Sequence, residues 1–243
     1  MVRGESRIKI FVVCPQLHCK IVNYLIPVHN EAVNISSLLR RILWVDSAAQ
    51  ICLVDSACCD ESMGLANGYP VHIRSAPKGY AQALAVGYRF AVQHQWTHLI
   101  QLDADGQHDP IYAHALYGML SKADWVIASR HRTGSFGGLM MRSMAMLSRK
   151  MWLPENLQDP SSGYWGLNQK MIQRFSALFP VDFTEIPLRI SQQQEGVRIR
   201  EICIPMQHRK EGISMNSGFK GVVHGLRMLD ACRKAKKNRE FQA

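Results

Sequence analysis

The sequence predicts an α/β fold built on a mostly parallel sheet that is flanked by helices. Along the first half of the chain, short apolar runs alternate with longer segments of helical periodicity. Short, almost wholly apolar strands are typical of a parallel sheet covered on both faces, and the helices between them make the crossovers. The 243 residues, 47% of them apolar and 20% charged, have the length and composition of a globular protein.

The first strand and helix are expected between residues 21 and 43. Residues 21–26 form a short, mostly apolar run that ends at Pro27. The apolar residues of the next segment are spaced i, i+3, i+4, i+7 and i+8, which predicts an amphipathic helix. They are Ile35, Leu38, Leu39, Ile42 and Leu43.

The same alternation continues to residue 128. The expected strands are residues 51–54, 71–74, 98–102 and 125–128, and the expected helices are residues 81–92 and 110–120. Asp55 directly follows the first of these strands, and Asp103 directly follows the third. Pro110 favours a helix start because its fixed φ suits the first helical turn.

The second half is less regular and more basic. Residues 197–204 read as a strand and residues 218–237 as a helix, and no linker separates them from the first half. We therefore expect an N-terminal extension or additional edge strand at 1–20, one main domain at 21–217, and a basic amphipathic helix and tail at 218–243.

The charge balance points to anionic partners. With 29 Lys and Arg against 19 Asp and Glu, the formal charge is +10. Residues 197–243 hold 11 basic and 4 acidic side chains, and residues 129–154 hold five basic and no acidic ones. Nucleic acid, an anionic membrane face or a phosphorylated ligand could account for such a bias. No nucleic-acid recognition motif or aromatic stacking array accompanies the charge, so no nucleic-acid partner is expected.

Other composition features indicate a cytoplasmic protein. The longest run without Lys, Arg, Asp or Glu is residues 90–102, which contains two His and three Gln. A membrane-spanning helix needs about 20 mostly apolar residues, so none is expected. The first ten residues contain four charged side chains and no long apolar block follows them, unlike a secretory signal. The seven Cys form no C-x-x-C pair, which favours reduced thiols.

A pair of carboxylates follows the strand at residues 98–102. Asp103 and Asp105 stand two residues apart and Gln107 adds a third oxygen, an arrangement that could hold Mg²⁺ or Mn²⁺ against phosphate oxygens. By itself, a D-x-D triplet is weak evidence, because such triplets arise by chance and usually form solvated turns. An EF-hand is excluded because the ligand spacing and closing Glu are missing after Asp109.

Several motifs in chain order resemble those of family 2 glycosyltransferases. They are P-V-H-N-E from Pro27, V-D at 54–55, K-G-Y-A-Q-A-L-A-V-G from Lys78, L-D-A-D-G-Q-H-D-P from Leu102, A-S-R at 128–130, D-P-S-S-G-Y from Asp159, I-R-E-I-C-I-P from Ile199 and R-K-E-G-I-S from Arg209. The D-A-D-x-Q-H string and the basic segment after Ser129 look most like the dolichol- and polyprenyl-phosphate sugar synthases. The likeness covers roughly residues 21–237.

The resemblance implies a GT-A nucleotide-diphospho-sugar transferase architecture and a metal-dependent, inverting transfer of a hexose. The implied donor is a UDP- or GDP-sugar, the implied acceptor a polyprenyl phosphate at the cytosolic membrane face, and the implied cofactor Mg²⁺ or Mn²⁺. The residues implied to contact the nucleotide are Pro27, His29, Asn30, Glu31, Asp55, Gly79, Asp103 and Arg209. Gly79 would let the backbone approach the nucleotide, and Arg209 would face its phosphates or the acceptor.

The remaining implied roles concern the metal and the acceptor. Asp103, Asp105 and Gln107 would hold the cation, and Arg130, Arg132 and Arg142 would receive the acceptor phosphate. Asp105, Arg130 and Arg142 are the implied catalytic residues, because cations and guanidinium groups stabilise the charge of a departing diphosphate. The arginines could equally form an ordinary solvated basic face.

The nature of the acceptor decides whether a protein base is needed. An ionised phosphate acceptor can attack without a base, because its second pKa is about 6. A neutral hydroxyl acceptor would need one, with Glu185 or Asp159 as candidates. Both residues have equally plain structural interpretations, Glu185 as a helix cap and Asp159 as part of a turn.

Two departures from the family pattern leave rival interpretations open. Val54-Asp55-Ser56-Ala57-Cys58 stands where the family usually has V-D-D-G-S, and Met215 stands where synthases often carry Lys. A glycosyltransferase with a soluble or hydroxyl acceptor, and a non-catalytic sugar-nucleotide binding protein, are the alternatives. The basic helix at 218–237 could pack on the core or lie on an anionic bilayer, as a lipid-phosphate acceptor would favour.

Overall fold

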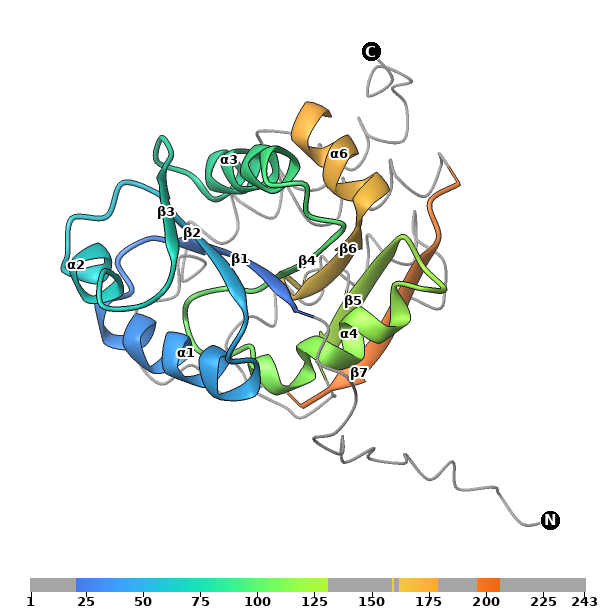
Figure 1. Cartoon of the computed structure of the whole chain (residues 1–243), viewed down its shortest axis with the longest axis horizontal. Helices are drawn as coiled ribbons and strands as arrows, with labels where there is room; N and C mark the ends of the chain where they lie inside the picture. Colours follow the sequence, from blue (N-terminus) through green and yellow to red (C-terminus); the bar gives the residue numbers. More distant parts are fainter. Residues whose placement is uncertain (1–20, 131–158, 160–161, 179–195, 206–243) are drawn as a thin grey trace, which may run out of the picture.

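A computed structural model describes residues 21–130, 159, 162–178 and 196–205. Among these residues, seven strands form one sheet in the order β3-β2-β1-β4-β6-β5-β7 (Figure 1). The strands are β1 (Asn23–Val28), β2 (Gln50–Asp55), β3 (His72–Ser75), β4 (His98–Gln101), β5 (Trp125–Arg130), β6 (Trp165–Asn168) and β7 (Ile199–Ile204). The helices are α1 (Ala32–Val45), α2 (Ser62–Ala66), α3 (Tyr80–Gln93), the 3₁₀ helix η1 (Pro110–Tyr112), α4 (Ala113–Met119) and α6 (Gln169–Leu178).

The mostly parallel sheet expected from the sequence is confirmed. β1 runs parallel to β2 and β4, β2 to β3, and β5 to β7. β6 is the exception, because it pairs antiparallel with both β4 and β5. The expected elements through residue 128 and at 197–204 are present, with boundaries shifted by a few residues. The α2, β6 and α6 elements were not predicted, and the expected helix at 218–237 lies outside the described residues.

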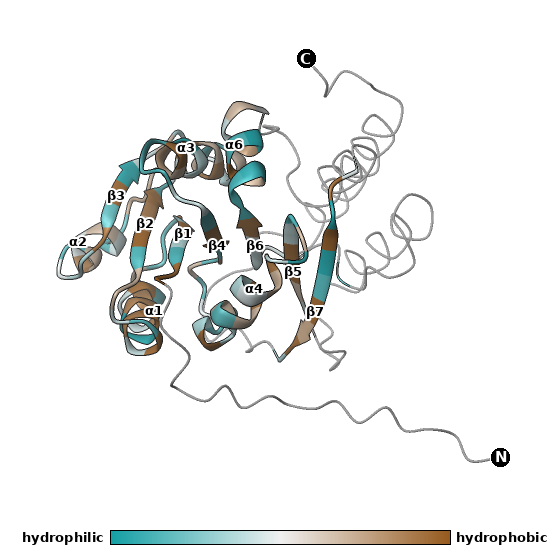
Figure 2. Ribbon diagram, turned by 45° about the vertical axis from the view of Figure 1, so that its right-hand side comes forward, coloured by the Kyte–Doolittle hydropathy of each residue, from teal (hydrophilic) through white to brown (hydrophobic). Residues whose placement is uncertain are grey.

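Helices cover both faces of the sheet. In Figure 1, α3 and α6 lie on one side of the strands and α1 and α4 on the other. Successive side chains of a strand point to opposite faces. Leu25 of β1 accordingly packs in one core cluster with Leu84 of α3 and Met171 of α6. Its neighbour Ile26 packs in the other cluster with Leu39 of α1. Figure 2 shows the resulting apolar interior between the layers.

Pro27 lies inside β1, although the sequence predicted that the strand would end there. Val22 and Val28 carbonyls accept hydrogen bonds from β2-side residues at 3.2 and 2.8 Å, whereas Leu25 accepts from Leu102 at 3.2 Å. The alternation directs position 27 to the β4 side, where pairing has already stopped at Leu25. The missing N–H of proline therefore costs no ladder hydrogen bond.

No helix in the described part of the chain is long and apolar enough to cross a membrane.

Candidate active site

The candidate site lies at the carboxyl ends of β1, β2 and β4. The chain passes from β1 to β2 on one side of β1, and returns to β4 on the other side. Ligands of open α/β sheets bind beyond the strand ends at such a switch point. The P-V-H-N-E segment follows β1, Asp55 ends β2, and the D-x-D segment follows β4.

The segment after β1 is fixed by its neighbours. His29 Nδ1 donates to the Ser56 carbonyl at 2.8 Å. Asn30 adopts a left-handed backbone with φ 55°. Glu31 precedes α1, and its carboxylate accepts a hydrogen bond from Asn34 Nδ2 at 2.7 Å. Pro27 is buried in the strand, so the exposed part of this segment begins at His29.

The altered segment after β2 forms a closed turn. Asp55 Oδ1 accepts from the Cys58 amide at 2.8 Å, and Ala57 is left-handed with φ 57°. The Asn30 amide donates to Cys58 Sγ at 3.3 Å, and the Cys59 amide donates to Asn30 Oδ1 at 2.8 Å. Burial raises the pKa of Cys58 to about 11, so this group remains a thiol near neutral pH. The segment thus keeps a defined conformation without the family's second carboxylate and Gly.

Gly79 is required by the backbone itself. It caps the start of α3 with φ 139°, a conformation that L side chains rarely adopt. Its amide donates to the hydroxyl of buried Ser56 at 2.9 Å, which joins the start of α3 to the end of β2. The conformational requirement explains this glycine before any approach to a nucleotide is considered.

Asp103 is held from two directions. The Tyr80 hydroxyl donates to Asp103 Oδ1 at 2.9 Å. The Asp103 amide donates to Nδ1 of buried His108 at 3.0 Å, which puts the imidazole proton on Nε2. The side chain of Asp103 remains 33% exposed. Two residues on, Asp105 Oδ1 accepts from the Gln107 amide at 3.1 Å and so shapes the same loop.

The donor atoms of this loop fit a hard divalent cation. Asp103, Asp105 and Gln107 offer oxygen ligands only, which Mg²⁺ and Mn²⁺ prefer. Across the described ranges, no three His, Cys, Asp or Glu side chains form a group that could hold a metal. A cation held here would take its remaining oxygens from the phosphates of a ligand.

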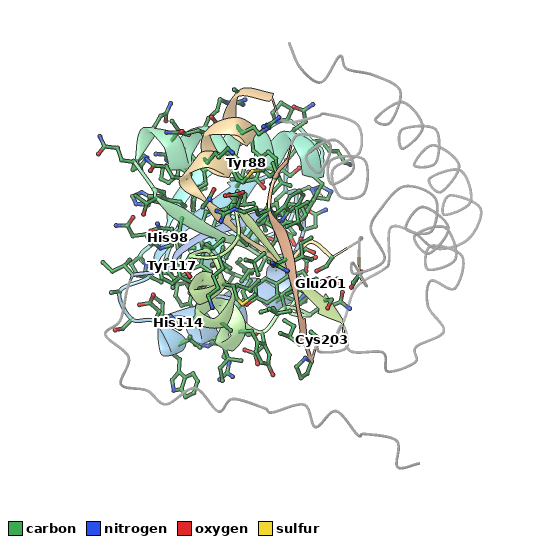
Figure 3. The ribbon with its side chains drawn as sticks, turned by 90° about the vertical axis from the view of Figure 1, so that its right-hand side faces the viewer. Tyr88, His98, His114, Tyr117, Glu201 and Cys203 are labelled. Atoms are coloured by element: carbon green, nitrogen blue, oxygen red, sulfur yellow. The ribbon has the colours of Figure 1, made fainter. Side chains whose placement is uncertain are left out.

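The segment before β6 packs directly against Asp103. A Cβ added to Gly163 would lie 2.9 Å from both Asp103 Oδ2 and the Tyr80 hydroxyl, so only glycine fits without displacement. Asp159, the candidate base, is buried, and its amide donates to Glu201 Oε1 of β7 at 2.7 Å. Figure 3 shows the position of Glu201 on this strand. The antiparallel direction of β6 brings its preceding segment to the edge where β4 ends.

The basic residues predicted to bind the acceptor are placed only in part. Arg130 is the last residue of β5, in register with Ile204 of β7. Arg132, Arg142, Glu185, Arg209 and Met215 lie outside the described residues. Their roles stay predictions.

Three contributors to the site were not singled out from the sequence. Tyr80 and Gly163 lay within quoted motifs but carried no assigned role of their own. Gln101 is a fully buried amide at the end of β4. Such a residue is a signal for an internal polar network, because buried polar groups need partners.

The names of three relatives in sequence all combine mannose with a polyprenol-type phosphate. The polyprenol monophosphomannose synthase of Mycolicibacterium smegmatis is 25% identical over 236 residues, covering 86% of this chain and 89% of that protein. The undecaprenyl-phosphate mannosyltransferase of Micrococcus luteus is 27% identical over 220 residues, covering 82% and 88%. The dolichol-phosphate mannosyltransferase of Saccharomyces cerevisiae is 25% identical over 231 residues, covering 84% of each chain.

Solved structures share the fold. Glucosyl-3-phosphoglycerate synthase from Mycobacterium tuberculosis, crystallised with Mn²⁺, UDP and glucosyl-3-phosphoglycerate, superposes with a TM-score of 0.66 at 16% identity. The match covers 88% of this chain and 79% of that one. Mannosyl-3-phosphoglycerate synthase from Rubrobacter xylanophilus gives a TM-score of 0.62 at 14% identity, covering 90% and 76%. The expected GT-A architecture is confirmed.

A family-wide comparison gives the same answer as the fold. The sequence model of glycosyl transferase family 2 matches residues 24–176, from β1 into α6 and through the carboxyl ends of β1, β2 and β4. Because this match covers more than half of the chain, the protein belongs to glycosyl transferase family 2.

Proposed function

We propose that this chain transfers a mannosyl group from a UDP- or GDP-linked donor to a polyprenyl phosphate, with Mg²⁺ or Mn²⁺ as cofactor. One observation carries the proposal: three relatives aligned over 82–86% of the chain have names that combine mannose transfer with a polyprenol-type phosphate. The proposed sugar, mannose, is therefore more specific than the general hexose expected from the sequence.

The donor nucleotide is assigned to the switch point between β2, β1 and β4. The proposed contacts for the base and ribose are Pro27, His29, Asn30, Glu31 and Asp55. Gly79, Asp103 and Arg209 complete the proposed nucleotide set. The hydrogen-bonded loops after β1 and β2 support this assignment, because they fix polar groups at adjacent strand ends. Asn30, in the loop after β1, contacts both Cys58 and Cys59 of the loop after β2.

The diphosphate is assigned to the loop after β4. Asp103, Asp105 and Gln107 would hold the cation, which supplies electrostatic stabilisation of the departing nucleoside diphosphate. Structures of the same fold were crystallised with Mn²⁺ or Mg²⁺ and UDP, which supports a divalent cofactor. Asp105 is the proposed catalytic residue among these three.

The acceptor phosphate is assigned to the arginines that follow β5. Arg130, Arg132 and Arg142 would bind it, since guanidinium groups recognise phosphate through paired N–H donors. A phosphate oxygen attacks the anomeric carbon, the bond to the donor's β-phosphate oxygen breaks, and the nucleoside diphosphate leaves with that electron pair. The attack inverts the anomeric centre. The ionised acceptor needs no protein base, so Asp159 and Glu185 are not required for this reaction.

The reaction is assigned to the cytosolic membrane face. A polyprenyl phosphate resides in a bilayer, and the basic residues of the predicted helix and tail at 218–243 would attract anionic lipid. We propose peripheral contact through this segment, with the rest of the enzyme in the cytoplasm.

The test is transfer from radiolabelled donors by the purified full-length chain. GDP-mannose, UDP-glucose and UDP-mannose are each incubated with undecaprenyl phosphate or dolichyl phosphate, or with 3-phosphoglycerate as a soluble acceptor. We expect mannosyl lipid as the main product, inhibition by EDTA, and recovery with Mn²⁺. Transfer to 3-phosphoglycerate alone would overturn the lipid acceptor, and binding of donor without turnover would favour a binding protein.

Carboxylate variants test the metal assignment. Asp105→Asn is expected to lower the transfer rate by at least about 100-fold, because the stabilisation of the leaving group is lost. Glu61→Gln removes a carboxylate from an exposed residue beside α2 and is the matched control, with an expected rate within twofold of wild type. Full activity of Asp105→Asn, or activity indifferent to EDTA, would contradict a metal bound at this loop.

A further inference from the structure

A chain of four hydrogen bonds runs from the core to Asp103. Trp165 Nε1 donates to the Tyr88 hydroxyl at 3.3 Å, and that hydroxyl donates to Gln101 Oε1. Gln101 Nε2 then donates to the Tyr80 hydroxyl at 3.1 Å, and Tyr80 donates to Asp103 Oδ1 at 2.9 Å. The chain joins β6, α3 and β4 and ends on a proposed metal ligand. Figure 3 labels Tyr88 on α3, beside α6.

Every donor in this chain of hydrogen bonds points toward Asp103. The indole of Trp165 can only donate, so the Tyr88 oxygen accepts and its proton turns to Gln101. The Gln101 amide orientation is fixed, because its nitrogen also donates to the Gly163 carbonyl at 3.2 Å. Its nitrogen supplies a proton to Tyr80, so the Tyr80 hydroxyl proton is directed to the carboxylate. Aligned hydrogen bonds polarise and strengthen one another.

Burial holds the first three residues of this chain of hydrogen bonds in place. Trp165, Tyr88 and Gln101 are all fully buried, whereas Tyr80 is half-buried and Asp103 is partly exposed. The direction of these hydrogen bonds persists at neutral pH because a tyrosine hydroxyl stays protonated there, and burial raises the pKa of Tyr88 still further. Asp103 thus accepts a hydrogen bond from the Tyr80 hydroxyl, whose direction is fixed by buried residues, while its carboxylate remains accessible.

We infer that Tyr80 is a positioning residue that orients the Asp103 carboxylate for the divalent cation, with Gln101 fixing the direction of its hydroxyl proton. The inference rests on the proposed function, because it requires Asp103 to bind the metal. Groups that hydrogen-bond to metal ligands typically change metal affinity by about 10–100-fold when removed. In this proposal Tyr80 contacts Asp103 and does not contact the substrate directly.

The experiment is Mn²⁺ titration followed by electron paramagnetic resonance, on the full-length chain with saturating UDP or GDP. The nucleotide used is whichever raises the wild-type melting temperature more. Tyr80→Phe removes only the hydroxyl, and we expect it to raise the Mn²⁺ dissociation constant by about tenfold. Tyr69→Phe is the matched control: its half-buried hydroxyl donates to the Ser36 carbonyl at 3.3 Å, remote from this loop. We expect its Mn²⁺ affinity to stay within twofold of wild type.

A double-mutant cycle distinguishes positioning from a general structural role. In an Asp103→Ala background Tyr80 has no carboxylate to orient, so adding Tyr80→Phe should change Mn²⁺ affinity by less than twofold. An equal loss in both backgrounds, or wild-type affinity of Tyr80→Phe, would overturn the inference. A fall in melting temperature with unchanged affinity would assign Tyr80 to stability alone. If Asp103→Ala itself leaves Mn²⁺ affinity unchanged, the proposed metal role of Asp103 fails, independently of Tyr80.

Discussion

Asp124 joins three strands of the sheet through one carboxylate. It precedes β5, accepts from Asn168 at the end of β6 at 2.9 Å, and accepts from the amide and guanidinium of Arg198, just before β7, at 3.0 Å each. The Arg198 side chain is the main cause that lowers the pKa of Asp124 to about 2. A depressed pKa means that folding favours the ionised form.

Asp124→Asn is expected to destabilise the protein in a pH-dependent way. The unfolded pKa is about 3.9, so the stabilisation is fully present above that pH and is lost as pH falls through about 2. At pH 7 we expect a loss of about 1–2 kcal/mol in the free energy of unfolding. Urea denaturation at pH 7 and at pH 3 measures it, with Glu61→Gln as control. A pH-independent difference between wild type and variant would contradict the ion-pair explanation.

Residues of the candidate site were predictable where the signal is local. Asp103 and Asp105 are two positions apart and follow a short strand, and the family motifs around them, rather than the triplet alone, single them out as candidates. Tyr80 and Gly163 lie 23 residues before and 60 residues after Asp103. The pairing of β4 with β6 brings Gly163 to Asp103, and the packing of α3 on the sheet brings Tyr80 there. No periodicity in the sequence encodes that meeting.

Helix α3 approaches β1 more closely than any side chain at position 87 would allow. A Cβ on Gly87 would lie 2.1 Å from Leu25 Cδ1, in the middle of the interface between the two elements. Glycine in a helix interior costs about 1 kcal/mol relative to alanine. Close contact between helix and strand, rather than helix propensity, therefore explains this residue.

Gly87→Ala is expected to destabilise the protein by about 1–3 kcal/mol, because overpacking at Leu25 outweighs the gain in helix propensity. Gly118→Ala is the matched control on α4, where an added Cβ meets nothing within 4 Å. We expect that control to be neutral or slightly stabilising. Thermal unfolding of both variants measures the difference. Equal melting temperatures would show that α3 can shift away from β1 without cost.

At the scale of elements, the prediction succeeded for the strands and long helices of the first half and missed α2, β6 and α6. α1 and α3 each have 14 residues and a clear apolar face, so their spacing identifies them. β6 has four residues, one of them glycine, and shows too short a pattern to read. β1 runs past Pro27 because of where β4 stops pairing, which is a tertiary fact and not a property of the proline.

Across the whole molecule, the charges are divided between two regions of the sequence. The carboxylates of the candidate site follow β1, β2 and β4, whereas residues 197–243 and 129–154 hold most of the basic excess. The proposed binding of a cation by acidic side chains, and of phosphate or lipid by basic side chains, accounts for the net charge of +10 without a nucleic-acid partner. The proposed membrane contact follows from the second group.

Replacing Lys234, Lys236 and Lys237 by Gln is expected to weaken binding to anionic vesicles. Each basic residue near such a surface contributes about 1 kcal/mol, so the partition coefficient should fall by roughly 100-fold. Flotation with phosphatidylglycerol-containing vesicles at low and high salt measures it. A variant with Arg89, Lys122 and Lys170 replaced by Gln has the same net charge and should float like wild type. Equal flotation of both variants would contradict contact through residues 218–243.

The antiparallel strand β6 also has a consequence for biosynthesis. Among the described strand pairs, β6 alone links β4 to β5, and β5 in turn carries β7. β5 leaves the ribosome earlier than β6, and until Trp165–Asn168 has emerged it has no place in the sheet that β1–β4 have begun. Strands waiting in this way expose unpaired edges and slow folding. The nascent chain can therefore pair β1–β4 first, and β5 joins the sheet only when β6, a later and short strand, is inserted between β4 and β5.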